Sequence, residues 1–459
     1  YNTPFENPSK KYLDWMDFNQ RFVSQFAKQC VDIVHKHNRK AIMFFGDHWA
    51  GTEPYGKYFQ NIGLDAVVGA AGDGVTTRMI ADIPVKETEA RFYPYFFPDV
   101  FHEGGDPVGE STRVWRKCRR AMMRKPMDRM GYGGYLSLAY KFPAFIDHVS
   151  DVADQFRSIV ENAKGTKPYS APFKVAVLNS WGHLRTWQTH QVAHSLWNQR
   201  CYSYLGAMEA LAGLPFEVEF ISFDDIRGGV PKDIGVILNA GDAGTSWSGA
   251  EYWKDPQITT ALRAWVYNGG GFIGIGEPTA CEYQGRFFQL ADVLGVQKEI
   301  GLTASCDKSA LQKVDSHFIT ADLQGPVNYG ESMPMIYQAS DSLAVLDVQN
   351  GSCTMAANEC GKGRAFYMAG MPYDLQNAPC CNAPSAGWRI RREKPQTGLR
   401  TMSTRKSRRI RKPAASRSLT TAPNRSVARS THRMERPMHL TCRAPAASGW
   451  ISKYRKVFW

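Results

Sequence analysis

The residues best suited to chemistry lie in the segment 45–56, Phe-Gly-Asp-His-Trp-Ala-Gly-Thr-Glu-Pro-Tyr-Gly, which follows the short apolar run 41–45. A carboxyl group beside an indole at the end of a strand can occupy an apolar pocket, which raises its pKa and keeps it protonated. Asp47, close to Trp49, therefore has the properties of a general acid that protonates a leaving glycosidic oxygen. Trp49 and Tyr55 suit stacking on a sugar ring.

A purely structural interpretation of the same segment stays open. In it, Asp47 caps the turn that follows and Glu53 is an ordinary surface residue. On spacing alone this interpretation is slightly the stronger of the two.

A second candidate is Arg91, which opens the run Arg-Phe-Tyr-Pro-Tyr-Phe-Phe-Pro-Asp at 91–99. An arginine on a strand offers a planar fork of donors that matches phosphate. The alternative is an ion pair with Glu89 or Asp73. The aromatic residues of this run are more typical of a core than of a sugar platform.

Three other clusters of residues do not predict a catalytic or binding site. The basic residues between 116 and 124 (Arg116, Lys117, Arg119, Arg120 and Arg124) are typical of a solvated helix face. Asp128 and the glycines of 131–134 are expected to end a further strand, without the spacing of a phosphate loop. The glycines of 269–276 lie before and within a predicted strand, so they are not a dinucleotide fingerprint.

The elements that must position Asp47 and Arg91 alternate between helix and strand. Apolar periodicity predicts a helix over 17–38 and another over 107–124, and short apolar runs predict strands at 41–45, 66–69 and 90–97. This alternation predicts part of a (β/α) TIM-like barrel, in which chemistry takes place at the carboxyl ends of the strands. Asp47 falls at such an end.

A linker at 167–172 separates this part from a second α/β segment. Predicted strands at 174–179, 218–222, 236–240 and 271–276 favour an open parallel sheet. The expected domains are therefore a partial catalytic barrel at 1–167, an α/β domain at 168–378 and a basic tail of low order at 379–459.

The composition is that of an ordinary soluble globular protein: of 459 residues, 43% are hydrophobic and 22% charged. No apolar run is long enough for a membrane helix, and the start shows no signal core, so we expect a cytoplasmic protein. The first residue is Tyr1 rather than Met, which suggests that the natural N-terminus is missing. The ten cysteines include no Cys-x-x-Cys pair, which argues against a zinc site and favours free thiols.

The net charge of +13 comes from the tail, where 20 Lys and Arg accompany only Glu393 and Glu435 from Pro379 onward. A basic arm can bind nucleic acid, but this composition favours disorder. The segment 361–373 predicts a strand and turn that should lead into a closing helix, and no such helix pattern follows. We therefore expect a frameshift near Ala378 and a tail that is not native.

The run 264–277 resembles the strand and nucleophile elbow of class I glutamine-amidotransferase-like domains. Those domains carry a cysteine at the elbow, where this sequence has Gly276. Without a thiolate there is no acyl-enzyme chemistry. The resemblance therefore implies an inherited fold whose original activity is lost.

The chain as a whole resembles the lacto-N-biose/galacto-N-biose phosphorylase family. The matching runs extend from Tyr12 to Tyr373 and comprise 12–18, 46–56, 63–69, 78–84, 91–99, 123–138, 220–225 and 285–292. The resemblance implies an incomplete catalytic barrel, an amidotransferase-like middle domain, and a C-terminal β domain whose place is taken here by the basic tail. It also implies a longer barrel portion before Tyr1.

On this resemblance, Asp47 matches the family's general acid, Arg91 a phosphate-binding arginine and Tyr95 a sugar-contacting tyrosine. His48, Trp49 and Glu53 are the further candidate substrate contacts. The implied reaction is inverting phosphorolysis of a galactosyl-β1,3-N-acetylhexosamine to α-galactose 1-phosphate. Phosphate is a co-substrate, and neither a metal nor an organic cofactor is implied.

Two other function classes remain open on sequence alone. A β-galactosidase-like hydrolase requires a second carboxylate, for which Glu53, Asp73 and Glu89 are candidates. A non-catalytic sugar-binding protein would use the same scaffold without turnover. The sequence leaves open the acceptor sugar (N-acetylglucosamine, N-acetylgalactosamine or rhamnose) and the oligomeric state, with a homodimer as one candidate.

Overall fold

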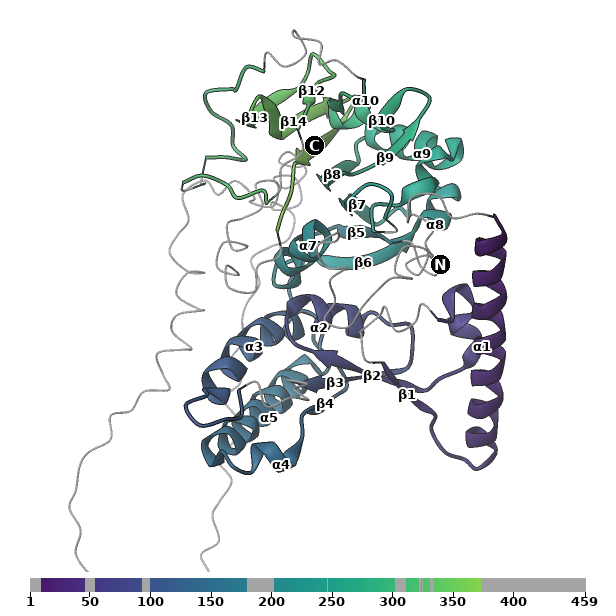
Figure 1. Ribbon diagram of the computed structural model, residues 1–459, viewed down its shortest axis with the longest axis vertical. Coiled ribbons are helices and arrows are strands. Elements are labelled where there is room, and N and C mark those ends of the chain that lie inside the picture. Colours follow the sequence, from purple (N-terminus) through teal and green to yellow (C-terminus); the bar gives the residue numbers. More distant parts are fainter. Residues whose placement is uncertain are drawn as a thin grey trace, which may run out of the picture. The chain divides into compact units, whose positions relative to one another are not determined.

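The structure is a computed structural model, shown in Figure 1. It describes residues 10–45, 54–92, 100–179, 202–245, 247–301, 311–321, 323, 325–330 and 334–372. The predicted basic tail, 379–459, lies outside these residues.

The N-terminal part is a four-stranded sheet in the order β1-β2-β3-β4, with every neighbouring pair parallel. Parallel strands need crossover connections, which here are mostly helical. The elements, in chain order, are α1 (Lys10–Lys36), β1 (Ile42–Phe45), the 3-10 helix η2 (Gly56–Ile62), β2 (Ala66–Ala71), α2 (Gly74–Ala81), β3 (Glu87–Phe92), α3 (Pro107–Met122), β4 (Arg129–Tyr132), α4 (Leu136–Ala139) and α5 (Pro143–Ala163). This is the helix–strand alternation that the sequence predicted.

One face of this sheet is packed against helices. Ala90 and Phe92 of β3 are fully buried in a cluster with Trp115 of α3 and Phe145 of α5. The ring of Phe92 meets the edge of Trp115 at 5.7 Å between centroids. Each large side chain buried in this way stabilises the fold by about 1.5–3 kcal/mol.

The other face of the sheet carries the alternate residues of each strand. Side chains of neighbouring strands that are paired in register point to the same side. Ile42 and Phe44 on β1 are 49% and 51% exposed, and Glu87, Glu89 and Arg91 on β3 are only partly buried. In a closed (β/α) barrel, this is the face that points to the interior.

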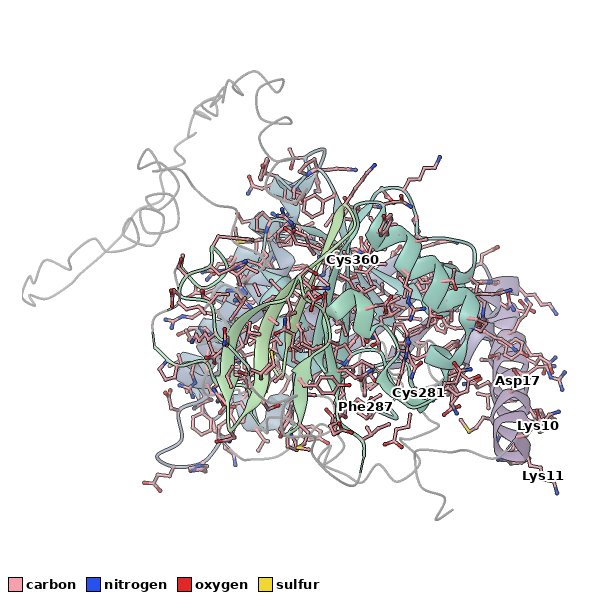
Figure 2. All side chains as sticks on the ribbon, turned by 90° about the horizontal axis from the view of Figure 1, so that it is seen from above. Lys10, Lys11, Asp17, Cys281, Phe287 and Cys360 are labelled. Carbon is pink, nitrogen blue, oxygen red and sulfur yellow. The ribbon has the colours of Figure 1, made fainter. Side chains whose placement is uncertain are left out.

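Helix α1 presents an exposed aromatic stripe. Trp15, Phe18, Phe22 and Phe26 recur at spacings of three and four residues and are 45–63% exposed. Neighbouring rings of the stripe stack, with 5.8 Å between the centroids of Trp15 and Phe18. The helix stands at one side of Figure 2, where the labelled Lys10 and Lys11 project from its first turn.

The helix predicted over 17–38 is present as α1, which begins earlier, at Lys10, and only part of its apolar surface is covered. Val31 is buried at 4% exposure, whereas Phe22, Phe26 and Ile33 are 57–63% exposed in the described structure.

The second part is a seven-stranded sheet in the order β13-β14-β15-β8-β7-β5-β6. Strands β6, β5, β7, β8 and β15 run parallel to one another, while β14 is antiparallel to β15 and β13 is antiparallel to β14. The strands of this sheet are β5 (Lys174–Asn179), β6 (Glu217–Ser222), β7 (Ile234–Gly241), β8 (Gly271–Gly276), β13 (Ala344–Gln349), β14 (Ser352–Cys360) and β15 (Gly363–Met368). All four strands predicted for this segment are present.

Shorter elements surround the seven-stranded sheet. The helical ones are α7 (Tyr202–Ala212), α8 (Phe223–Arg227), the 3-10 helix η4 (Ala250–Lys254), α9 (Pro256–Tyr267) and α10 (Ala291–Leu294), and the strands are β9 (Ala280–Tyr283), β10 (Arg286–Phe288), β11 (Val296–Lys298) and β12 (Ile336–Gln338). The predicted linker, 167–172, lies between α5 and β5 without helix or strand. None of the described helices is long and apolar enough to cross a membrane.

Candidate active site

The carboxyl ends of β1, β2, β3 and β4 meet at one edge of the four-stranded sheet, because all four strands are parallel. The last residues of these strands are Phe45, Ala71, Phe92 and Tyr132. The segment that carries the predicted general acid leaves β1 at this edge. Residues of the loops that follow the strands are therefore the candidates for catalysis.

Arg91 is the predicted site residue that the structure describes. It is the second-last residue of β3 and lies in register between Ala70 of β2 and Gly131 of β4. Its guanidinium carbon sits 4.2 Å from the ring centroid of Phe44, so a cation–π contact orients the group. Arg91 thus lies on the uncovered face, close to the carboxyl edge.

Burial gives this arginine the character of an anion-binding group. Partial burial lowers the pKa of Arg91 from its ordinary value. An arginine nevertheless keeps its charge at neutral pH, because its ordinary pKa is so high. A partly desolvated guanidinium attracts an anion more strongly than one in bulk water. The arrangement suits a phosphate dianion that approaches from the carboxyl edge.

Gly133 makes room for the stem of Arg91. A Cβ atom built on Gly133 would overlap Cγ of Arg91 and lie 2.8 Å from its Cδ and 3.1 Å from its Nε. A Cβ on Gly131 would meet nothing within 4 Å. The sequence flagged this glycine cluster but assigned it no role, because spacing alone does not show which side chain passes over a glycine.

The other predicted site residues, Asp47, His48, Trp49, Glu53 and Tyr95, lie outside the described residues. Strand β1 ends at Phe45, two residues before Asp47, and β3 ends at Phe92, three residues before Tyr95. Both strands therefore end at the edge near Arg91. Tyr55, expected as a sugar platform, instead packs into the core against Phe45 and Phe59.

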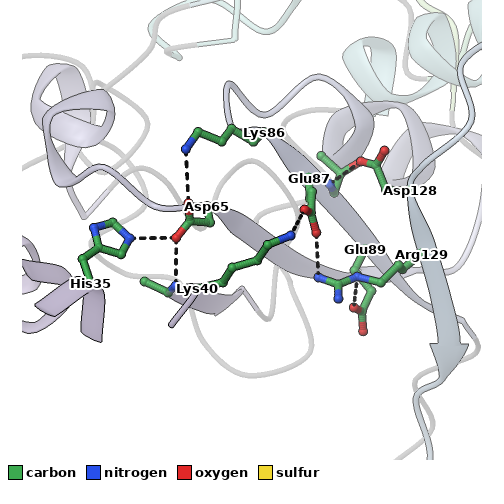
Figure 3. A network of polar contacts seen from close by, with 10 residues as sticks. His35, Lys40, Asp65, Lys86, Glu87, Glu89, Asp128 and Arg129 are labelled. Atoms are coloured by element: carbon green, nitrogen blue, oxygen red, sulfur yellow. Dashed lines mark hydrogen bonds and ion pairs between the residues drawn. The ribbon is translucent and has the colours of Figure 1, made fainter. Parts of the chain in front are cut away.

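Glu89, a candidate second carboxylate, is engaged in an ion pair. It is paired in register with Arg129, whose Nε lies 3.2 Å from the Glu89 carboxylate. Another nitrogen of Arg129 lies 3.2 Å from Glu87. Figure 3 shows these contacts from close by.

The polar network in Figure 3 belongs to the amino-terminal edge of the sheet. Asp65, directly before β2, accepts a 2.9 Å hydrogen bond from the backbone N–H of Ala41, and its carboxylate lies 2.7 Å from Nε2 of His35. The hydrogen bond from Ala41 has the largest effect and the contact with His35 the next largest, and together they lower the pKa of Asp65 to about 2. In barrels, polar groups at this edge serve stability rather than chemistry.

Asp128 also belongs to this edge, and its prediction as the end of a strand was wrong. It precedes β4 and accepts a 2.8 Å hydrogen bond from the backbone N–H of Thr88. The glycines at 133 and 134 do follow β4, as predicted. Polar residues flank a strand at both ends, so only the register shows which edge each one occupies.

Asp73, the other described carboxylate candidate, begins α2. Its side chain accepts a 2.8 Å hydrogen bond from the backbone N–H of Thr76, and its own backbone N–H donates a 3.1 Å hydrogen bond to the hydroxyl of Thr76; these two bonds form a capping box. The cap fixes the loop between β2 and α2 at the carboxyl edge.

The sequence predicted that the basic residues of 116–124 form a solvated helix face, but some of them are packed against other segments. Arg120 forms a 2.8 Å ion pair with the buried Glu209 of α7, and Arg124 donates a 2.8 Å hydrogen bond to Ser170. Partial burial lowers the pKa of Arg124. A charge pattern gives no information about which neighbour packs on it, so these contacts were not predictable. In the ranges that the structure describes, no three His, Cys, Asp or Glu side chains group closely enough to hold a metal ion.

The sequence of this chain matches two known protein-family models. The family described as the N-terminal TIM barrel domain of lacto-N-biose phosphorylase matches residues 1–171, and that of the central domain of lacto-N-biose phosphorylase matches residues 174–382. The chain belongs to the lacto-N-biose phosphorylase family. The four-stranded parallel sheet is accordingly part of its TIM barrel domain, and the seven-stranded sheet is its central domain.

Curated members of the lacto-N-biose phosphorylase family are closely similar. A 1,3-β-galactosyl-N-acetylhexosamine phosphorylase of Lachnoclostridium phytofermentans is 51% identical over 381 residues, which cover 82% of this chain and 52% of the relative. The enzyme of that name from Bifidobacterium longum subsp. longum is 45% identical over 412 residues, 82% of this chain and 55% of the relative. The chain therefore spans about half the length of these relatives.

A relative of lower sequence identity is named for another disaccharide. The D-galactosyl-β-1→4-L-rhamnose phosphorylase of L. phytofermentans is 35% identical over 378 residues, 81% of this chain and 51% of the relative. Among solved structures, a β-galactosidase from Rahnella sp. R3 matches 82% of this chain and 58% of its own, at 15% identity and a TM-score of 0.42.

Proposed function

We propose that the protein represented by this chain phosphorolyses galactosyl-β1,3-N-acetylhexosamines with inversion and yields α-galactose 1-phosphate and the free N-acetylhexosamine. The observation that carries the proposal is the placement of Arg91: a partly buried cation over Phe44, near the carboxyl edge of the parallel sheet. Membership of the lacto-N-biose phosphorylase family supports the same assignment.

In the proposed mechanism, Arg91 holds the phosphate and orients one of its oxygens toward the anomeric carbon. That oxygen forms a new bond to the carbon while the glycosidic bond breaks on the opposite side of the ring. Asp47 gives its proton to the departing oxygen of the N-acetylhexosamine. Phosphate brings its own negative charge, so the protein needs an acid for the leaving group but no base to activate water.

The sugar contacts proposed for this site follow, in sequence, the two strands β1 and β3, which end beside Arg91. Tyr95 follows β3, and His48, Trp49 and Glu53 follow β1. Their aromatic and polar side chains suit a galactosyl ring, which offers one apolar face and a rim of hydroxyls. The acceptor in this proposal is an N-acetylhexosamine, either N-acetylglucosamine or N-acetylgalactosamine.

The engagement of two carboxylates favours phosphorolysis over hydrolysis. An inverting hydrolase needs a second carboxylate about 6.5–9.5 Å from the acid to activate water, and a retaining hydrolase needs one at about 5–5.5 Å as a nucleophile. Glu89 is ion-paired with Arg129, and Asp73 caps α2. Of the three candidates for a hydrolytic base, only Glu53 is left, and it lies outside the described residues.

For the central domain we propose an amidotransferase-like scaffold without the original chemistry. Gly276 ends β8 in a left-handed conformation, at a φ of 79°, which is the sharp strand-end geometry that an elbow requires. A Cβ at this position would lie 3.1 Å from the carbonyl oxygen of Gly241. Glycine suits this geometry, and its lack of a thiol excludes acyl-enzyme chemistry at this position.

The test uses the full-length gene product. It is incubated with galactosyl-β1,3-N-acetylhexosamine with and without phosphate, alongside an Asp47→Asn variant that keeps the shape of the side chain but has no acidic proton. We expect phosphate-dependent galactose 1-phosphate from the wild type and at least about a hundredfold less from the variant. Free galactose formed without phosphate would establish a hydrolase, and sugar binding without any product would establish a binding protein.

A further inference from the structure

Glu209 is a buried carboxylate to which the proposed mechanism assigns no role. It lies on α7 of the central domain, and its side chain is 2% exposed. One carboxylate oxygen accepts a 3.1 Å hydrogen bond from the backbone N–H of Val75, and the other lies 2.8 Å from the guanidinium of Arg120. The same guanidinium donates a 2.6 Å hydrogen bond to the backbone carbonyl of Glu209.

The contact with Val75 places a negative charge at the start of α2. Val75 is the second residue of that helix, and backbone N–H groups in the first turn of a helix have no partner within it. A carboxylate at this position satisfies one of them and interacts favourably with the helix dipole. Helices α7 and α2 lie next to each other (Figure 1).

Helices α7 and α2 pack so closely that there is no space for a side chain at Gly74. A Cβ on Gly74 would lie 2.7 Å from a carboxylate oxygen of Glu209 and 2.9 Å from Cβ of Ala212. The start of α2 is therefore held both by a hydrogen bond and by direct packing against α7.

The start of α2 is tied in turn to the loop at the carboxyl edge. Strand β2 ends at Ala71 and α2 begins at Gly74, so the loop consists of Gly72 and Asp73. The hydroxyl of Thr76 accepts hydrogen bonds from the backbone N–H groups of both loop residues, at 3.0 and 3.1 Å. Whatever fixes the first turn of α2 therefore fixes this loop as well.

The loop borders the candidate phosphate site. Ala70, two residues before Gly72, is paired in register with Arg91 of the neighbouring strand. A shift of the loop away from β3 would open the edge beside Arg91.

The charges around Glu209 act in opposite directions. Burial and, after it, the carboxylate of Asp73 raise the pKa of Glu209, while Arg120, Lys117 and the N–H of Val75 lower it. The direction that prevails is upward, because burial is the largest cause. Arg120 and Val75 therefore hold a carboxyl group whose charged form the surroundings otherwise disfavour.

We propose that Glu209 is a positioning residue for phosphorolysis: through the first turn of α2, it holds the β2–α2 loop in place beside Arg91. The central domain would thus contribute to the catalytic edge without touching the substrate. The effect of Glu209 on phosphate kinetics rests on the proposed function, whereas its role in holding the β2–α2 loop does not.

The test uses Glu209→Gln, which keeps the volume of the side chain but has one acceptor oxygen in place of two. Val75 and Arg120 donate to different oxygens of Glu209, so in the amide one of these two acceptors is replaced by an NH2 group. Glu219→Gln is the matched control, because Glu219 of β6 is a half-exposed carboxylate that pairs with Lys174 within the same domain. Amide hydrogen exchange is measured at residues 72–77 of the present chain, and phosphate kinetics are measured on the full-length enzyme.

We expect Glu209→Gln to speed exchange at residues 72–77 by at least about tenfold and to raise the KM for phosphate by about tenfold. The KM for the disaccharide should change less than about twofold in Glu209→Gln. In Glu219→Gln, the exchange at residues 72–77 and both KM values should also change less than about twofold. Unchanged exchange would overturn the inference, and so would faster exchange with an unchanged KM for phosphate. If the wild type shows no phosphorolysis, the proposed function fails, while the exchange data still decide whether Glu209 holds the loop.

Discussion

The role of Arg91 can be tested without removing its charge, by changing Gly133 to alanine. Gly133 and Gly131 both have backbone conformations open to other residues, since neither has a positive φ. The added methyl group would overlap Cγ of Arg91 and lie 2.8 Å from Cδ, so the arginine stem has to move. The guanidinium then leaves its position over Phe44.

The size of the effect follows from the hydrogen bonds that the displaced guanidinium can no longer donate to phosphate. A hydrogen bond between charged groups contributes about 1.5–3 kcal/mol. If displacement of the guanidinium removes one such bond in the transition state, kcat/KM for phosphate falls about 10- to 150-fold. The fold should lose no more than about 1 kcal/mol, because Arg91 is only partly buried and a long side chain can reorient.

The assay compares Gly133→Ala with Gly131→Ala in the full-length enzyme, with initial rates measured at varied phosphate and saturating disaccharide. Gly131 is the matched control, because it is the register partner of Arg91 and a Cβ there meets nothing within 4 Å. We expect a loss in kcat/KM for phosphate in Gly133→Ala alone. Equal values for the two variants would refute the assignment of Arg91 to phosphate.

Three further predictions concern stability and surface. Asp65→Asn should lower the free energy of unfolding at pH 7 by about 1 kcal/mol, measured by urea unfolding. Because the folded-state pKa of Asp65 is lowered to about 2, this stabilisation is present above pH 4 and disappears as the pH falls toward 2; a difference that stays constant with pH would contradict it. Replacing Phe22 and Phe26 together by serine should reduce the binding of an apolar fluorescent dye to this chain, whereas Lys28→Ser on the same helix should not. Equal dye binding by both variants would show that the stripe is covered in solution. Gly276→Ala should destabilise the chain by about 1–2 kcal/mol, since it forces a side chain into a left-handed conformation, and should leave phosphate kinetics unchanged; altered kinetics would argue against a purely structural role.

The strands predicted for the second sheet were predictable because β5, β6, β7 and β8 each contain buried apolar residues. The runs at 174–179 and 271–276 became β5 and β8, with the expected parallel order. The position of Arg91 near the end of a strand was not predicted: the run 90–97 placed it at the start of a strand, whereas it is the second-last residue of β3. Its contact with Phe44 was not predictable either, because it depends on the register of β1 relative to β3 across the intervening β2.

Contacts between distant segments account for the remaining differences. Glu209 lies 134 residues from Val75, and nothing near it in sequence marks it as the partner of a helix start. The basic face of α3 looked solvated because a charge pattern does not reveal the packing of a second domain. For α1, the apolar stripe identified the face correctly, yet burial depends on which element packs on it, and the pattern carries no information about that element.

The most direct test of the central claim is the configuration of the first product. The full-length enzyme is mixed with galactosyl-β1,3-N-acetylhexosamine and phosphate in the magnetic field, and the galactose 1-phosphate formed in the first minutes is followed by proton and phosphorus NMR. Direct attack by phosphate predicts the α-anomer from the first time point. The β-anomer, or free galactose before any sugar phosphate, would contradict the account.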